Sequence, residues 1–120
     1  MGERAVHAGC PRLMSMLTDD VVLLAPGIPP IHGSAAARAL YESLFQRFAR
    51  IDQTVATQEI IVAGDWAWSW GTESIRLTAA GTAAIIELEG SGMAVMRRTS
   101  DGAWKFARAI NNDLPGARPR

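Results

Sequence analysis

Residues 64–72, GDWAWSWGT, place three of the four tryptophans of the chain at every second position. Because successive side chains of a β-strand point to opposite faces, this alternation predicts a strand with two unlike faces. The bulky face carries three indoles about 7 Å apart along the strand, on Trp66, Trp68 and Trp70. The opposite face carries only small side chains, on Ala67, Ser69 and Gly71. Such a strand belongs in a sheet whose two faces meet different surroundings.

The segments around this strand predict an α+β fold. The clearest helix has Ser34 as its expected N-cap and continues to residue 48, with apolar residues at the i, i+3, i+4, i+7 spacing. Long strands separated by short turns surround the tryptophans and follow them, over residues 51–63, 66–77, 82–98 and 103–112. Earlier, we expect a helical turn over residues 3–8, a short helix beginning at Pro11 and a strand over 21–27. Together these elements predict one curved antiparallel sheet with helices on its concave face.

Composition excludes several classes of protein. Lys plus Arg equals Asp plus Glu at 12 each, so no net charge attracts nucleic acid or an anionic membrane. The single cysteine, Cys10, cannot form an intramolecular disulfide and suits a reducing compartment. Without a signal-peptide pattern or a bilayer-length apolar run, we expect a cytoplasmic protein.

The length predicts a single domain over residues 1–114 and a flexible tail over residues 115–120. Two histidines and one cysteine, scattered along the chain, make no metal-ligand set, so neither a metal nor a cofactor is predicted.

Two longer stretches carry a resemblance to a known superfamily. LTDDVVLLAPGIPPIHGSAAARALYESLF (17–45) has an acidic pair before a strand, a proline-glycine loop and an amphipathic helix. VMRRTSDGAWKFARAINND (95–113) has the pattern of a closing hairpin. Together they resemble the nuclear transport factor 2-like superfamily, also called ketosteroid isomerase-like or SnoaL-like. The resemblance implies a cone-shaped, cystatin-like α+β barrel, a pocket between helices and sheet, and a homodimer through the outer face of the sheet.

The superfamily contains isomerases, polyketide cyclases, epoxide hydrolases and binding modules, so the resemblance specifies the fold better than the function. Ketosteroid isomerases need a carboxylate base, with a tyrosine and a protonated aspartic acid in the oxyanion hole. The resemblance puts Ala25 at the position of the base and Ala94 at that of the aspartic acid, while the tyrosine falls near Gly2. Isomerisation by that mechanism is therefore not expected.

The same resemblance implies which residues of the closing hairpin face the interior, and alternation extends this to the tryptophan strand. Trp104, Phe106, Arg108 and Ile110 are expected outside. The expected pocket residues are mostly small: Ala25, Ala67, Ser69, Gly71, Gly92, Ala94, Ala107, Ala109 and Asn111. The expected dimer interface is aromatic: Trp66, Trp68, Trp70 and Phe106. The alternative is that a single β-bulge reverses the pleat and turns the indoles into the cavity.

Three polar residues are candidates for catalysis. Glu73 is expected inside the pocket, where an apolar environment would raise its pKa, although pairing with Arg38, Arg76 or Arg97, or a place at a solvated rim, is the simpler role. His32 can act as an acid or base or cap backbone groups of its loop. Asp20 can act in the pocket or end the preceding helix in a turn.

Three functions remain open. The first is a dimeric domain that binds a small hydrophobic molecule in an apolar pocket, which the missing ketosteroid isomerase set favours. The second is an isomerase, cyclase or hydrolase acting on a hydrophobic or polyketide-like substrate by general acid–base catalysis. The third is a module whose role is self-association.

Overall fold

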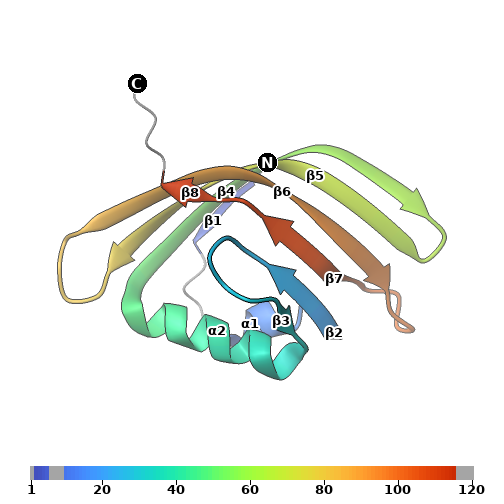
Figure 1. Cartoon of the computed structure of the whole chain (residues 1–120). Helices are drawn as coiled ribbons and strands as arrows, with labels where there is room; N and C mark the ends of the chain where they lie inside the picture. Colours follow the sequence, from blue (N-terminus) through green and yellow to red (C-terminus); the bar gives the residue numbers. More distant parts are fainter. Residues whose placement is uncertain (1, 6–9, 116–120) are drawn as a thin grey trace.

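The computed structural model describes residues 2–5 and 10–115, so the tail predicted beyond residue 115 lies outside the described part. Figure 1 shows an arched sheet with both helices beneath its concave side. The elements in chain order are β1 (Gly2–Ala5), α1 (Cys10–Met14), β2 (Leu17–Leu24), β3 (Ile31–His32), α2 (Ser34–Arg47), β4 (Phe48–Ala63), β5 (Trp66–Ala79), β6 (Ile85–Arg98), β7 (Trp104–Asn111) and β8 (Leu114–Pro115). The α+β prediction is confirmed.

The sheet is mixed and open. Its strand order is β1-β4-β5-β6-β7-β2-β3, and β8 pairs with β6. The pairing of β2 with β7 is parallel, which corrects the expectation of a wholly antiparallel sheet. The described strands β1 and β3 form its two edges and do not pair with each other, so the sheet is curved without closing into a barrel.

Most predicted elements are present, with shifted ends. The expectation that Ser34 is the N-cap is wrong by one residue, because Ser34 is the first residue of α2 and Gly33, at φ 89°, is the N-cap, so no side chain caps the first turn. The helical turn expected over residues 3–8 is wrong for Gly2–Ala5, which form β1 against residues 52–55 of β4. An edge strand offers unpaired backbone groups, and pairing with them can outweigh a weak local helix preference. Residues 6–9 lie outside the described part.

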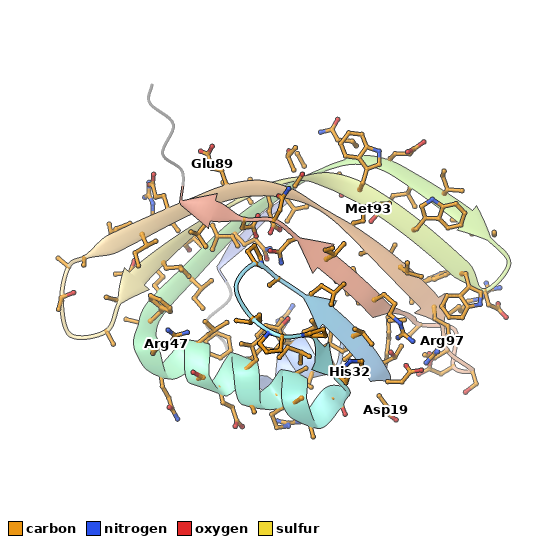
Figure 2. The ribbon with its side chains drawn as sticks, viewed as in Figure 1. Asp19, His32, Arg47, Glu89, Met93 and Arg97 are labelled. Carbon is orange, nitrogen blue, oxygen red and sulfur yellow. The ribbon has the colours of Figure 1, made fainter. Side chains whose placement is uncertain are left out.

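The side chains of β5 point to the faces of the sheet that the sequence predicts. Trp66, Trp68 and Trp70 are exposed, while Ala67 between them is buried at 3%. In the neighbouring strand β6, Met93 pairs with Trp70, and Figure 2 shows Met93 projecting from the convex side. The indoles therefore lie on the convex face, away from the helices, and the alternative that they line a cavity is wrong.

A bulge in the last hairpin changes the direction of two aromatic residues. Val95 pairs with Arg108 and Met96 pairs with Phe106, so the intervening Ala107 has no partner of its own. The extra residue moves Phe106 to the concave side, and Trp104, two residues earlier, shares that side. The expectation that both point outward, and that Phe106 belongs to a dimer interface, is therefore wrong.

The hydrophobic core lies between α2 and one end of the sheet. Leu17, Val21 and Ala37 are its buried members, and Phe106 packs against them. The core is small because the helices cover only part of the concave face. Beyond them, Ile60 and Val62 pair with Ser69 and Ala67 and stay about 60% exposed on the concave side.

The bulge predicts unequal effects of substitutions at neighbouring positions of β7. Phe106→Ala should lower the free energy of unfolding by about 3 kcal/mol, because it removes an aromatic ring from the core. Lys105→Ala, one residue away on the opposite side of the pleat, should change it by less than about 0.5 kcal/mol. Urea unfolding followed by tryptophan fluorescence measures both, and equal effects would contradict the bulge.

Candidate functional site

Three glycines on neighbouring strands form a bare patch on the concave face. Gly71 of β5 pairs with Gly92 of β6, and Gly90 pairs with Glu73. A Cβ at Gly71 would lie 2.4 Å from the carbonyl oxygen of Ala56, so only glycine permits this close approach of backbones. We call Gly71, Gly90 and Gly92 the glycine floor, because the polar side chains of the candidate site stand around it.

Glu73 and Asp113 meet across Gly90. The pairing of Asn111 with Gly92 and of Leu114 with Glu89 brings Asp113 beside Gly90, on the side opposite Glu73. Side chains on strands separated by a third strand are normally kept apart by the residue between them. Here that residue is glycine, and a Cβ at Gly90 would lie 2.7 Å from Asp113 Oδ1. The missing side chain therefore provides the space in which the two carboxyl groups meet.

The carboxyl group of Asp113 keeps its proton at neutral pH. Burial, the hydrogen bond with Glu73 and the negative charge of Glu73 raise the pKa of Asp113 to about 8. Asp113 Oδ1 is buried and has no hydrogen-bond partner among the described residues, so ionisation would leave a buried negative charge without a donor. Gln53 of β4 completes the cluster, donating from Nε2 to Glu73 Oε1 at 2.9 Å. We call Gln53, Glu73 and Asp113 the carboxyl cluster.

The arginines expected to neutralise Glu73 have other partners or lie elsewhere. Arg76 binds Glu87 at 2.9 Å, and Arg97 binds Asp20 at 3.1 Å. Arg38 is exposed on α2. The expectation of an arginine partner for Glu73 is therefore wrong.

The other two catalytic candidates are not brought to Glu73. Asp20 accepts hydrogen bonds from Arg97 and Thr18, and these bonds lower its pKa, so it stays ionised as a structural ion pair. Two strands, β6 and β7, separate its strand β2 from β5. His32 is exposed on the edge strand β3. The predicted trio does not form one site.

The predicted pocket residues divide into two groups, with Ala25 outside both. Ala67 and Ala107 are buried at 3% and 0%, so they belong to the packed interior and offer no surface to a ligand, contrary to expectation. The half-buried residues on the concave side of β5, β6 and β7 are Ser69, Gly71, Gly92, Ala94, Ala109 and Asn111. Gly71, Gly92 and Asn111 lie nearest to the carboxyl cluster, and the other three lie two residues further along the same strands. Ala25 lies just beyond the end of β2.

Sequence reasoning missed Gln53 and Asp113, although each has a detectable signal. Gln53 alternates with Ile51 and Val55, so it is a polar residue at a position of β4 that faces the interior. Asp113 ends the polar run NND directly after the last long strand, where chains often carry functional side chains. Its contact with Glu73, 40 positions earlier in the numbering, depends on the pairing of β5, β6 and the terminal segment.

An open hollow of about 480 Å³ lies mainly on the convex face, and its lining also includes Glu73 of the carboxyl cluster and Gly90 of the glycine floor. Its exposed lining residues share the side of the pleat that carries the indoles: Thr54, Ala56, Thr72, Ser74 and Glu89. Figure 2 shows Glu89 projecting from this side. The described residues contain no group of three or more His, Cys, Asp or Glu side chains placed to hold a metal ion. They also contain no helix long and apolar enough to cross a bilayer.

The role of Gly90 can be tested by adding one methyl group. Gly90→Ala should separate the carboxyl groups, because its Cβ would occupy the position within 2.7 Å of Asp113 Oδ1. The pKa of Asp113 should then fall from about 8 toward the ordinary value of about 4. A ¹³C carboxyl titration by NMR measures this value. Ser91→Ala, whose side chain points to the convex side, is the matched control and should leave the pKa near 8.

The raised pKa of Asp113 also predicts a pH dependence of stability. Folded Asp113 keeps its proton up to about pH 8, whereas the unfolded chain loses it near pH 4. Between these values the folded state binds more protons, so the contribution of Asp113 to the free energy of unfolding decreases as pH rises. Asp113→Asn should remove this decrease. Urea unfolding of both proteins at intervals from pH 4.5 to 9 measures the difference, and parallel curves would contradict the assignment.

Comparisons with known proteins agree with this architecture. The family model of the SnoaL-like domain matches residues 4–107. A conserved protein from Planctomyces limnophilus is 34% identical, with a TM-score of 0.79 over 86% of this chain and 79% of that one. A ketosteroid isomerase-like protein from Erwinia carotovora is 23% identical, with a TM-score of 0.75 over 87% and 80%. A hexachlorocyclohexane dehydrochlorinase from Novosphingobium barchaimii is 20% identical, with a TM-score of 0.71 over 92% and 78%. The search of curated proteins gave no significant match.

Proposed function

Starting from the fact that this chain belongs to the SnoaL-like domain family, we propose that it binds an uncharged hydrophobic small molecule on its concave face and exchanges a proton with it. Glu73 and Asp113 are the proton-transfer groups of this proposal. Asp113 enters the exchange as the acid and Glu73 as the base, which makes the protein a general acid–base enzyme.

The carboxyl cluster is the observation that carries the proposal. Two carboxyl groups in contact, one keeping its proton to about pH 8, provide an acid and a base side by side at neutral pH. Gln53 holds Oε1 of Glu73 at 2.9 Å and so limits the orientation of the carboxylate. Pairs of titratable groups whose environments separate their pKa values are typical of catalytic sites.

The surroundings of the cluster support a hydrophobic and uncharged ligand. Ala94 and Ala109 offer apolar surface next to the glycine floor, and the exposed concave residues Ile60 and Val62 extend it along β4. An anionic ligand would be repelled by the negative charge of Glu73. The named activity of one structural neighbour, dehydrochlorination of hexachlorocyclohexane, also favours a small apolar substrate here.

Proton transfer can be tested without knowing the natural substrate. Cyclohexanone in D₂O serves as the probe, because removal and return of a proton next to its carbonyl group exchanges hydrogen for deuterium. ¹H NMR should show faster exchange with the protein than with buffer, and Glu73→Gln and Asp113→Asn should each lower the excess rate at least tenfold. Glu87→Gln, an exposed carboxylate on the same sheet, is the control. Equal exchange by all four proteins would reject Glu73 and Asp113 as the acid and base.

The convex face supports a second proposal, that the protein is a homodimer. Its exposed apolar side chains form a continuous surface across β4 to β7, which we call the convex patch: Ile61, Trp66, Trp68, Trp70, Met93 and Ile110. An apolar surface of this extent usually marks an interaction site, and aromatic residues and Met are enriched at interface centres. A second copy of the chain could cover the same patch symmetrically.

Two adjacent isoleucines test the dimer. Ile61 lies in the convex patch, whereas Ile60 is exposed on the concave face. Light scattering coupled to size exclusion at micromolar concentration should give a dimer for the natural sequence and a monomer for Ile61→Asp and Trp68→Asp. Ile60→Asp introduces the same charge beside them and should remain dimeric. A monomeric natural protein would reject the proposal.

A further inference from the structure

The chain after β7 continues along β6 in an unchanged register. Asn111 pairs with Gly92, and β8 then pairs Leu114 with Glu89 and Pro115 with Leu88. Residues 112–115 therefore extend the line of β7 past the glycine floor as a terminal segment. Because β8 contains only two residues, its backbone pairing is a short attachment.

Side chains reinforce this attachment on either side of Gly90. Ser91 donates its backbone N–H to Asn112 Oδ1 at 2.8 Å, and Asn112 donates its own N–H to the carbonyl oxygen of Ser91 at 3.1 Å. The next residue, Asp113, bonds to Glu73 of β5. This second contact ties the terminal segment to β5, a strand beyond β6, and it depends on a proton.

We infer that the contact between Glu73 and Asp113 is a protonation-dependent latch, which holds residues 112–115 against β6 and releases them when both carboxyl groups are ionised. The inference adds regulation to the proposed function, because it rests on the concave face being the ligand site. Release would uncover Gly90 and separate the acid from the base, so the protein would bind and exchange protons in its latched, less alkaline form.

The charges around Asp113 favour release after ionisation. On β5, Asp113 faces the negatively charged Glu73. On β4, the residue behind Glu73 is the uncharged Gln53. On β6, Asp113 faces Gly90, since the neighbouring Glu89 points to the convex side. Its own segment supplies the uncharged Asn111 and Asn112. Among these residues no cation offsets a second negative charge, and two adjacent carboxylates repel each other.

Release of the terminal segment leaves the rest of the fold intact. β8 is attached to β6 alone among the described strands, so its departure breaks no other backbone pairing. The core around Leu17, Val21 and Ala37 lies on other elements and is not disturbed. Release is therefore a local opening rather than an unfolding of the domain.

Heteronuclear NMR of the ligand-free protein tests the latch. The ¹H–¹⁵N nuclear Overhauser effect of residues 112–114 should be that of rigid backbone at pH 6.5 and that of a flexible chain at pH 9.5. The amide shift of Ser91 should follow one titration centred near the pKa of Asp113, about 8. A segment that remains rigid at pH 9.5, with no such titration, would overturn the inference.

Amide variants separate the latch from general effects of pH. Asp113→Asn and Glu73→Gln each leave at most one charge in the contact, so both should keep the segment rigid at pH 9.5. Glu89→Gln removes a carboxylate from the adjacent position on the other face and should release the segment as the natural protein does. Release in both amide variants would also overturn the inference. Because the measurement contains no ligand, its outcome is independent of whether cyclohexanone exchange supports the proposed function.

Discussion

The uninterrupted pleat of β5 is the constraint on which both faces of the sheet depend. With no bulge in its pairing to β6, every second residue from Trp66 onward points to the convex side. The same alternation sends Ala67, Ser69, Gly71 and Glu73 to the concave side. A single inserted residue would exchange the two sets, moving three indoles into the interior and the carboxylate of Glu73 to solvent.

Glycine determines what the concave face can hold. At Gly71 the backbones approach so closely that no side chain fits, and at Gly90 the missing side chain leaves space for two carboxyl groups. Burying like groups together costs free energy unless one keeps a proton, and this is the state of Asp113 below about pH 8. The same small residue therefore accounts for the raised pKa of Asp113, for the acid and base of the proposed function, and for the proposed latch.

Local sequence patterns were sufficient for much of this architecture. The helical spacing after Ser34 and the alternation around the tryptophans depend only on residues a few positions apart, and the resemblance to the SnoaL-like domain is confirmed. Of the catalytic candidates, Glu73 lies in the carboxyl cluster, because its position was derived from that same alternation. His32 and Asp20 were selected as the nearest acid or histidine along the sequence, without a strand register to place them, and the structure leaves them elsewhere.

By itself, the sequence determined the α+β order of elements, the helix after Gly33 and the two unlike faces of β5, because these follow from short-range periodicity and turn chemistry. Tertiary structure alone decided the inward turn of Phe106, the parallel pairing of β2 with β7 and the meeting of Glu73 with Asp113. The physical reason is that register between strands is set by pairing energies over long sequence separations. One bulge at Ala107 or one missing side chain at Gly90 changes which residues meet, without altering any local pattern.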